Sequence, residues 1–320
     1  MTHSSDSPPS SPSSDVADAP DEEGTAPACV LVFNANDPSG AGGLTADATA
    51  IASVGAHALT VVTGTYARDT AEIFEHYCFE EEAVVEQARA VLEDIAVQVI
   101  KVGFVGSPEN LSVIAELACD YADVPLIAYM PNLSWWEEDQ IDSYLDAFRE
   151  LMLPQTTVLV GNHSTLWRWL LPDWSSERSP TARDIAKAAS EKGASYTLVT
   201  GIPLPDQHVD NVLATPEAIL VSCKFELFEA VFAGAGDTLS AALAALLAGG
   251  TELNEAVTEA LSYLDRCLDG GFRPGMGHIL PDRMFWAQPD TDDDADDDGA
   301  EDDGSPAGIA LEHGPHGTRH

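Results

Sequence analysis

The residues from Cys29 to Val54, which read CVLVFNANDPSGAGGLTADATAIASV, decide the fold. Cys29–Ala35 is a short apolar, β-branched run and predicts a buried strand. A loop rich in glycine follows it. From Leu44 onward the apolar residues recur at helical spacing, so the segment as far as Val54 predicts a helix. A strand, a glycine-rich loop and a helix in this order form the basic unit of an α/β fold.

The same alternation continues along the chain. Further strands are predicted at Ala58–Thr65, Val99–Phe104, Leu126–Met130, Thr157–Val160 and Tyr196–Thr200. Helices are predicted at Ala83–Ala96, Ser107–Tyr121, Glu138–Leu151, Thr181–Glu191 and Leu239–Ala248. Repeated alternation predicts a three-layer α/β fold with a mainly parallel central sheet and helices on both faces. Ligands of such folds bind beyond the carboxyl ends of the strands, so the loops after strands are where chemistry is expected.

Composition divides the chain into three zones. Residues 1–28 are rich in Ser, Pro and acid and predict a disordered tail. Residues 29–287 carry the strand and helix patterns and are expected to form the folded domain. Residues 288–320 contain the run DDDADDD at 292–298, which repels itself and predicts a second disordered acidic tail.

The charge of the whole chain is strongly negative. It has 54 acidic and 14 basic residues, a formal net charge of −40, and residues 29–288 alone hold 37 acidic and 13 basic residues. Such a surface repels nucleic acid and anionic membranes, so neither is an expected partner. It suits a cytoplasm of high salt, where repulsion is screened. The alternative is an ordinary acidic protein.

Other global features point to a reducing compartment. The five cysteines have no paired spacing, which argues against a disulfide framework and a zinc site. The N-terminus lacks the pattern of a signal peptide, and no apolar run is long enough for a membrane helix. We therefore expect a cytoplasmic protein.

Two glycine-rich loops are the candidate functional sites. The first, at 36–43, follows the first strand and matches neither a Walker loop nor the usual dinucleotide fingerprint. The second contains Gly234, Ala235, Gly236 and Asp237. Backbone amides at the start of the following helix would form an anion hole for a transferring phosphoryl group, and Asp237 would accept the proton of a substrate hydroxyl. The alternatives are a tight turn for the first loop and a simple helix cap for the second.

These motifs together resemble one family. The stretch Asp37–Asp47 resembles the N-terminal motif of the hydroxymethylpyrimidine/phosphomethylpyrimidine kinases of thiamine biosynthesis. Ile100–Phe104, Gly234–Ala245 and Gly275–His278 are similar to that family too, and the resemblance covers roughly residues 29–285. It implies a ribokinase-like fold, ATP and Mg²⁺ as cofactors, a hydroxymethyl heterocycle as substrate, and assembly as a homodimer.

The resemblance also implies site residues. Asp237 would be the catalytic base. The substrate side would comprise Asp37, Gly42, Gly43, Asp47, Tyr66, Arg68 and Phe104, with Tyr66 and Phe104 as apolar walls. The nucleotide side would comprise Asn162, Thr165, Thr200 and Gly201. No metal ligand is assigned.

Several positions depart from the family pattern. Arg68 stands where a Gln is common, and because Arg only donates hydrogen bonds it would suit a phosphate or carboxylate on the ligand. Asp237 stands where Cys is usual. Tyr129 replaces an acid and Thr165 replaces a Glu, which erodes the nucleotide side. Pyridoxal kinase, or a catalytically degenerate pyrimidine-binding member, are therefore alternatives to a hydroxymethylpyrimidine kinase.

Two further features stay open at the level of sequence. Lys101 lies on a predicted core strand and would pair either with an acid near the site or within a structural ion pair. Trp135 and Trp136 would form a lid or partner surface, or one would pack while the other stays half exposed.

Overall fold

A computed structural model describes residues 26–287. The described elements belong to one compact unit that ends at Trp286. Apart from residues 26–28, the expected disordered tails lie outside the described residues, so the three-zone division remains a prediction. Within residues 26–287 the structure has no helix of the length and apolarity that crossing a membrane requires.

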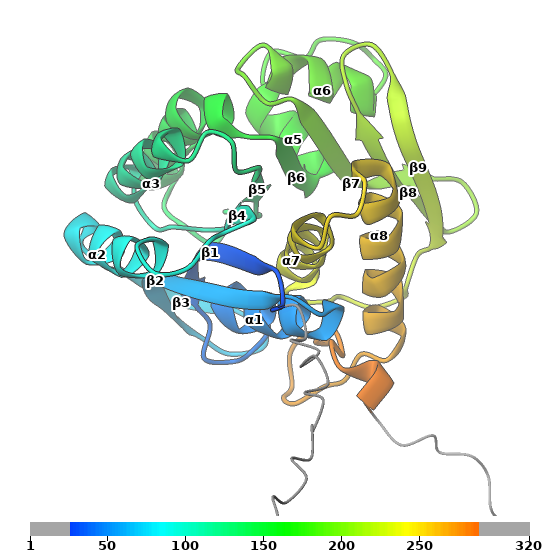
Figure 1. The fold of residues 1–320 in the computed structure, drawn as a ribbon. Helices are drawn as coiled ribbons and strands as arrows, with labels where there is room; N and C mark the ends of the chain where they lie inside the picture. Colours follow the sequence, from blue (N-terminus) through cyan, green and yellow to red (C-terminus); the bar gives the residue numbers. More distant parts are fainter. Residues whose placement is uncertain (1–25, 288–320) are drawn as a thin grey trace, which may run out of the picture. The chain divides into compact units, whose positions relative to one another are not determined.

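A nine-stranded sheet forms the centre of the fold (Figure 1). Its strands are β1 (Cys29–Asn36), β2 (His57–Arg68), β3 (Ile73–Cys78), β4 (Val99–Val102), β5 (Leu126–Met130), β6 (Val158–Asn162), β7 (Tyr196–Leu204), β8 (His208–Ala214) and β9 (Ile219–Glu226). They run in the order β3-β2-β1-β4-β5-β6-β7-β8-β9. The pairs from β2 to β7 are parallel, whereas β3, β8 and β9 join antiparallel at the two edges.

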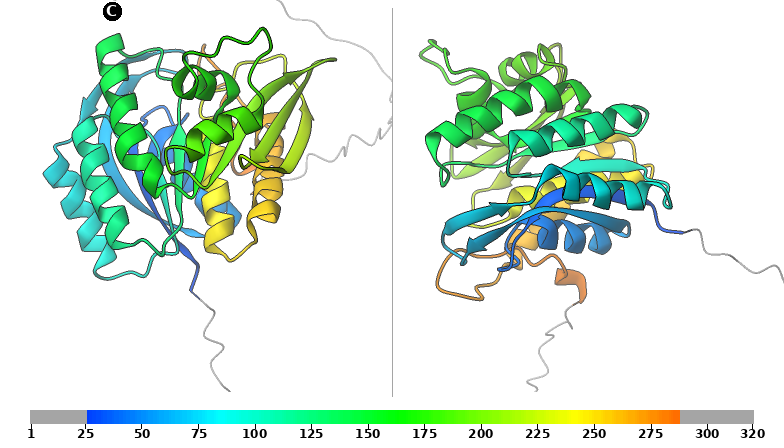
Figure 2. Two further views of the ribbon diagram at one scale, coloured as in Figure 1. Left: turned by 90° about the horizontal axis from the view of Figure 1, so that it is seen from above. Right: turned by 90° about the vertical axis from the view of Figure 1, so that its left-hand side faces the viewer.

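Helices cover both faces of the sheet (Figure 2). One face carries α1 (Gly43–Val54), α7 (Ala235–Ala248) and α8 (Leu253–Asp269). The other carries α2 (Glu81–Leu92), α3 (Pro108–Asp120), α4 (Glu138–Ala147), α5 (His163–Leu170) and α6 (Ala182–Ser190). Beyond α4 the chain makes a π-helical turn at Phe148–Met152 and a 3-10 turn at Leu153–Gln155, and a last 3-10 turn lies at Phe285–Ala287.

Alternation along the central strands explains the two cores. In β1, Val30 and Val32 face the core under α1 and α7, whereas Leu31 and Phe33 face the core under α2 and α3. All four side chains are at most 1% exposed. A strand that is buried on both faces must be apolar throughout, which is why β1 could be recognised from the sequence.

The predicted three-layer α/β fold is confirmed, with corrections at its periphery. All six predicted strands are present, but β3, β8 and β9 were not predicted. They lie at or near the sheet edges. β3 and β8 show neither a continuous apolar run nor a clean alternation, whereas β9 alternates apolar and polar residues from Val221 to Glu226, a strand signal that was missed. The helix predicted from Leu239 begins four residues earlier, at Ala235, and α8 was not predicted.

The packing of α1 against α7 places the two glycine-rich loops together. Both helices begin at the carboxyl edge of the sheet, directly after their loops. Small residues such as Ala50 and Ala241, both fully buried, let the helix axes approach closely. The fold therefore joins residues about 200 positions apart in the sequence at one point of the sheet edge.

Candidate active site

Glycine is required where the two loops meet. Gly234 precedes α7 with φ +83°, and a Cβ atom there would overlap the carbonyl oxygen of Ala41 in the first loop. Gly43 has φ +58°, and its Cβ would overlap the carbonyl oxygen of Ala35. Positive φ and close backbone approach both exclude larger side chains. The loops are thus in direct backbone contact.

Asp37 shapes the first loop from within. One of its oxygens accepts hydrogen bonds from the Ser39 amide at 2.9 Å and hydroxyl at 2.7 Å, and the other accepts from the Gly42 amide at 2.8 Å. Nη1 of Arg68 lies 3.3 Å from this second oxygen, and Nε of Arg68 donates to the carbonyl of Asp69. Arg68 was expected to meet an anionic group of the ligand, but its observed anionic partner is Asp37.

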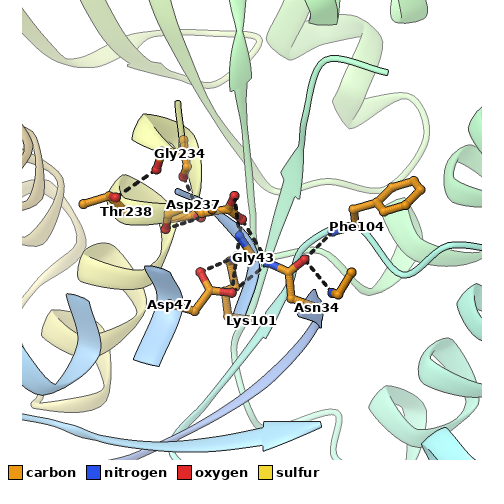
Figure 3. A network of polar contacts seen from close by, with 12 residues as sticks. Asn34, Gly43, Asp47, Lys101, Phe104, Gly234, Asp237 and Thr238 are labelled. Carbon is orange, nitrogen blue, oxygen red and sulfur yellow. Dashed lines mark hydrogen bonds and ion pairs between the residues drawn. The ribbon is translucent and has the colours of Figure 1, made fainter. Parts of the chain in front are cut away.

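Asp237 lies in the first turn of α7 and is held from several sides (Figure 3). Its Oδ1 accepts hydrogen bonds from Nδ2 of Asn34 at 2.9 Å and Nζ of Lys101 at 3.2 Å. Its Oδ2 accepts one from the amide of Gly43 at 3.2 Å. The side chain remains 16% exposed. Because Oδ1 is held by two buried donors, Oδ2 is the oxygen with capacity left for a ligand.

A buried ion pair lies beside Asp237. Nζ of Lys101 contacts both carboxylate oxygens of Asp47, at 2.7 and 2.9 Å, and both side chains are fully buried. Burial raises the pKa of Asp47 to about 6, and the Asp237 charge adds to this, while Lys101 and Asn34 oppose it. Burial alone would lower the pKa of Lys101, but the two carboxylates outweigh it and raise that pKa. Lys101 is therefore a persistent cation shared by two carboxylates.

The position of Asp47 corrects the sequence-based expectation. It was expected to line the substrate pocket, but its side chain is inaccessible and its oxygens are occupied by Lys101 and by Asn34 at 2.8 Å. Asp47 therefore acts on a ligand only through these neighbours. Lys101, whose partner the sequence left open, pairs with acids of the candidate site.

Two residues that organise the site were missed in the sequence. Asn34 accepts from the amides of Ala35 and Phe104 through Oδ1, which directs its Nδ2 toward both carboxylates. A polar residue within an otherwise apolar strand was the available signal. Arg283 is buried near the C-terminal end of the described residues. No feature of the surrounding sequence pointed to a role for it in the site.

Arg283 ties the two loops together. Its Nε donates to the hydroxyl of Thr238 at 2.9 Å. Its Nη1 and Nη2 donate to the carbonyls of Gly40 and Ala41, at 3.1 and 2.5 Å. One planar guanidinium thus fixes the start of α7 against the first loop.

The expected aromatic walls form a packed cluster. The rings of Tyr66 and Phe104 are nearly parallel, with centroids 5.9 Å apart, and Trp135 packs edge-on against both. Phe104 is only 2% exposed, so it supports the cluster rather than facing a ligand, contrary to expectation. Tyr66 is half-buried and can face one. Trp135 and Trp136 are both half-buried, and their rings stack with centroids 5.8 Å apart, so the two share one degree of burial where one was expected to pack and the other to stay half exposed.

The four expected nucleotide-side residues do not converge. Asn162 and Gly201 line a cavity of about 350 Å³ together with Ala235 of α7. Thr165 lines a different cavity, of about 230 Å³. The hydroxyl of Thr200 lies 3.4 Å from the carbonyl of Gly161 and does not line the first cavity. The first cavity also has apolar walls from β8, β9, the loop that follows β9, and α8, namely Val209, Phe225, Leu227, Phe228, Leu261, Leu264 and Leu268.

The carboxylates of the site are poorly placed to bind a metal ion on their own. Asp37 and Asp47 are buried and spend their oxygens on protein donors, and only Asp237 is partly exposed. Within residues 26–287 no cluster of three or more His, Cys, Asp or Glu side chains could hold a metal ion. A protein-bound Mg²⁺ site does not fit these residues.

Comparison with known proteins identifies the family. A family model described as phosphomethylpyrimidine kinase matches residues 37–282. The chain belongs to this family. The hydroxymethylpyrimidine/phosphomethylpyrimidine kinase of Streptomyces coelicolor is 28% identical over 262 residues, which cover 82% of this chain and 96% of that protein. The Escherichia coli enzyme of the same name is 26% identical, over 80% and 97% of the two chains.

Solved structures of similar fold are kinases as well. Pyridoxal kinase from Staphylococcus aureus, in complex with AMP-PCP and pyridoxal, has a TM-score of 0.72 at 18% identity, covering 82% of this chain and 96% of that one. Phosphomethylpyrimidine kinase from Clostridium difficile has a TM-score of 0.63 at 21% identity, covering 75% and 99%. This phosphomethylpyrimidine kinase family member is thus a small-molecule kinase of ribokinase-like fold.

Proposed function

We propose that this kinase transfers the γ-phosphoryl group of ATP to the hydroxymethyl group of a pyrimidine, and then phosphorylates the resulting phosphate, as in thiamine biosynthesis. One observation carries the proposal. The outward oxygen of Asp237, Oδ2, belongs to the same helical turn as the amides of Ala235 and Gly236. The first amides of a helix have no carbonyl of a preceding turn to bond, so they are available to an anion.

The geometry supports an in-line phosphoryl transfer. The hydroxymethyl oxygen attacks the γ-phosphorus while Oδ2 of Asp237 takes its proton, and the bond from phosphorus to the bridging oxygen of ADP breaks. The amides of Ala235, Gly236 and Asp237 stabilise the charge on the equatorial oxygens, assisted by the positive end of the α7 dipole. Asn34 and Lys101 hold Oδ1, which orients Oδ2 toward the substrate. Gly42 and Gly43 give the substrate close access to this oxygen.

The ATP would lie between the start of α7 and the cavity of Asn162 and Gly201. Ala235 lines that cavity and also begins the helix, so a nucleotide base in the cavity would extend its phosphates toward the amides. Phe225 and Leu264 offer apolar walls to the base. Mg²⁺, when bound, would neutralise phosphate charge, and it would be carried by the nucleotide and water because residues 26–287 offer no carboxylate set for it.

A pyridoxal-type substrate is the second candidate, because Arg68 favours it. The Arg68 side chain is 11% exposed at the first loop, and its guanidinium has only donors, so it suits a ring that bears a phenolate oxygen better than one that bears an amino group. Asp237 is a competent base for either hydroxymethyl group.

The test is ADP release in the presence of hydroxymethylpyrimidine, its phosphate, or pyridoxal, with Asp237→Asn as the diagnostic variant. Removing the general base should lower kcat by about 10²–10⁴-fold, with ligand affinity by calorimetry nearly unchanged. Asp146→Asn, at an exposed position on α4, is the matched control and should keep wild-type turnover.

Each outcome has a distinct meaning. Full activity of Asp237→Asn would refute the assigned base. Turnover of pyridoxal alone would favour the second candidate. Binding of a pyrimidine with no turnover in the wild type would indicate a catalytically degenerate family member.

A further inference from the structure

The hydroxyl of Tyr129 lies against Gly236, one of the residues of the proposed anion hole. Tyr129 lies near the carboxyl end of β5, and its ring packs in the core under α7. Its Oη presses against Gly236 so closely that a Cβ atom at Gly236 would collide with it. Gly236 is one of the residues whose amide faces the proposed phosphoryl position. A polar atom therefore lies directly beside the amides that would bind the transferring group.

The Tyr129 hydroxyl keeps its proton at neutral pH. Burial raises the pKa of Tyr129 well above its ordinary value, and the nearby charges of Asp237 and Asp47 raise it further. Nζ of Lys101 lies 5.7 Å from the ring centroid, where a cation draws electron density from the phenol and makes its O–H a better donor. The group is thus a neutral hydrogen-bond donor, not an anion that would repel phosphate.

Within residues 26–287 the structure gives this donor no protein acceptor. The nearby carboxylates are engaged with other donors, Asp237 with Asn34, Lys101 and Gly43, and Asp47 with Asn34 and Lys101. Tyr129 is half-buried, and its hydroxyl is not among the buried atoms that lack a partner, so it is open to water or to a ligand. The acceptor that the proposed reaction brings to this place is an equatorial oxygen of the phosphoryl group.

We propose that Tyr129 is a catalytic residue that donates a hydrogen bond to the transferring phosphoryl group and so completes the anion hole. This inference rests on the proposed kinase function. The proton stays on Tyr129 throughout, since the proton released by the substrate goes to Asp237. Tyr129 supplies a neutral donor where a carboxylate would instead require a metal ion to approach phosphate.

The test is Tyr129→Phe, which keeps the ring and removes only Oη. Loss of one donor of this kind should lower kcat by about 10²-fold, while KM for ATP changes less than about threefold. Binding of the ground-state analogue AMP-PCP should stay the same. Binding of ADP with aluminium fluoride, which mimics the transferring group, should weaken in proportion to kcat. A purely structural role would not separate these two affinities.

Tyr196→Phe is the matched control, because Tyr196 packs in the same core but at the amino end of β7. It should leave kcat and both affinities unchanged. Gly236→Ala is a second test, because the added methyl group displaces Oη without removing it. If Oη acts as proposed, Gly236→Ala should lower kcat less when it is combined with Tyr129→Phe than when it is made alone.

Wild-type kcat in Tyr129→Phe would overturn the inference, and so would a higher kcat, which would mean that Oη obstructs the hole. Either result leaves the kinase function intact as long as the wild type turns over ATP. Absence of turnover in the wild type with every hydroxymethyl heterocycle would instead remove the proposed function together with the inference.

Discussion

At the scale of single residues, the candidate site is organised around one lysine that pairs with two carboxylates. Lys101 and Asp47 are fully buried, and the Asp237 side chain is 16% exposed. A buried charge is tolerated only when it is paired and hydrogen-bonded, and Asn34 supplies further hydrogen bonds to both carboxylates. The same group of contacts stabilises the fold and fixes the candidate base.

Lys101→Met should be strongly destabilising. It leaves Asp47 and Asp237 as neighbouring buried carboxylates without a cation, which costs about 3–5 kcal/mol in the free energy of unfolding. The double variant Lys101→Met/Asp47→Asn removes one of these charges and should recover much of that loss. Urea unfolding of the two variants measures this. Equal free energies of unfolding for the two variants would show that Lys101 does not compensate the buried charge of Asp47.

Replacement of Asp47 by Asn should change how stability depends on pH. The pKa of Asp47 is about 6 in the folded protein and 3.8 in its ordinary state, so the folded state binds more protons between these values. Its contribution to the free energy of unfolding therefore falls as pH rises from about 4 to 6, by roughly 2–3 kcal/mol.

Asp47→Asn lacks this contribution. As pH rises from about 4 to 6, the free energy of unfolding of the wild type should therefore fall relative to that of the variant, because all other carboxylates are common to both. Urea titrations at several pH values measure it, and a pH-independent difference would contradict the assignment.

At the scale of elements, the site depends on the backbone contact between the loop before α1 and the start of α7. The two glycine-rich loops were both recognised in the sequence, because glycine clusters after strands are distinctive. That they touch, with Gly234 against Ala41, could not be inferred from spacing alone. Arg283 adds a side-chain tie between them from a third part of the chain.

Gly234→Ala should disrupt this contact. Its φ of +83° strains an alanine by about 1–3 kcal/mol, and the added Cβ meets the Ala41 carbonyl oxygen. Gly250→Ala, after the end of the same helix, is the matched control. Gly250 has φ +89° but nothing within 4 Å of its Cβ position, so it carries the strain without the collision.

Gly234→Ala should lose more stability than Gly250→Ala in thermal unfolding and should also lose most of its kcat. Gly250→Ala should keep wild-type kcat. If the two variants behave alike, the contact between the loops contributes nothing beyond backbone strain.

At the scale of the whole molecule, negative charge dominates. The net charge of the chain is −40, and it is still −24 over residues 29–288. The ion pairs found in residues 26–287 are few, and three of them belong to the candidate site. Most acidic side chains of residues 26–287 are therefore not in ion pairs, and their mutual repulsion opposes folding.

Salt should stabilise the protein. Raising KCl from 0.1 to 2 M shortens the screening length and should raise the free energy of unfolding by about 2 kcal/mol or more, or Tm by about 4–8 °C. Thermal unfolding in KCl should be compared with thermal unfolding in sucrose of equal osmolality. Sucrose stabilises proteins because it is excluded from their surface, so any additional effect of KCl reports the screening of charge. A Tm that is insensitive to KCl would contradict the interpretation as an adaptation to salt. Assembly as a homodimer and a cytoplasmic location remain predictions.

The sequence by itself determined the layer architecture and the family. Strands buried on both faces must be continuously apolar, and helices on a sheet must repeat their apolar residues at helical spacing, so both patterns are local and readable. The glycine-rich loops were readable for the same reason, since a backbone turn needs particular residues at particular positions. The edge strand β3 was missed because its half-exposed residues follow no strict pattern, whereas β9 was missed although Val221 to Glu226 alternate apolar and polar residues.

Only the tertiary structure decided which residues act together. Asp47 and Phe104 were expected to face the substrate and prove to be buried supports, whereas Asn34 and Arg283 prove to organise the site. Tyr129 stands where the family pattern has an acid, and its hydroxyl lies against Gly236 in the first turn of α7. These contacts join side chains that are far apart in the sequence. The distances between them depend on how the helices of both layers pack against the sheet. No local pattern carries that information, because a contact between distant side chains leaves no mark on the spacing of either segment.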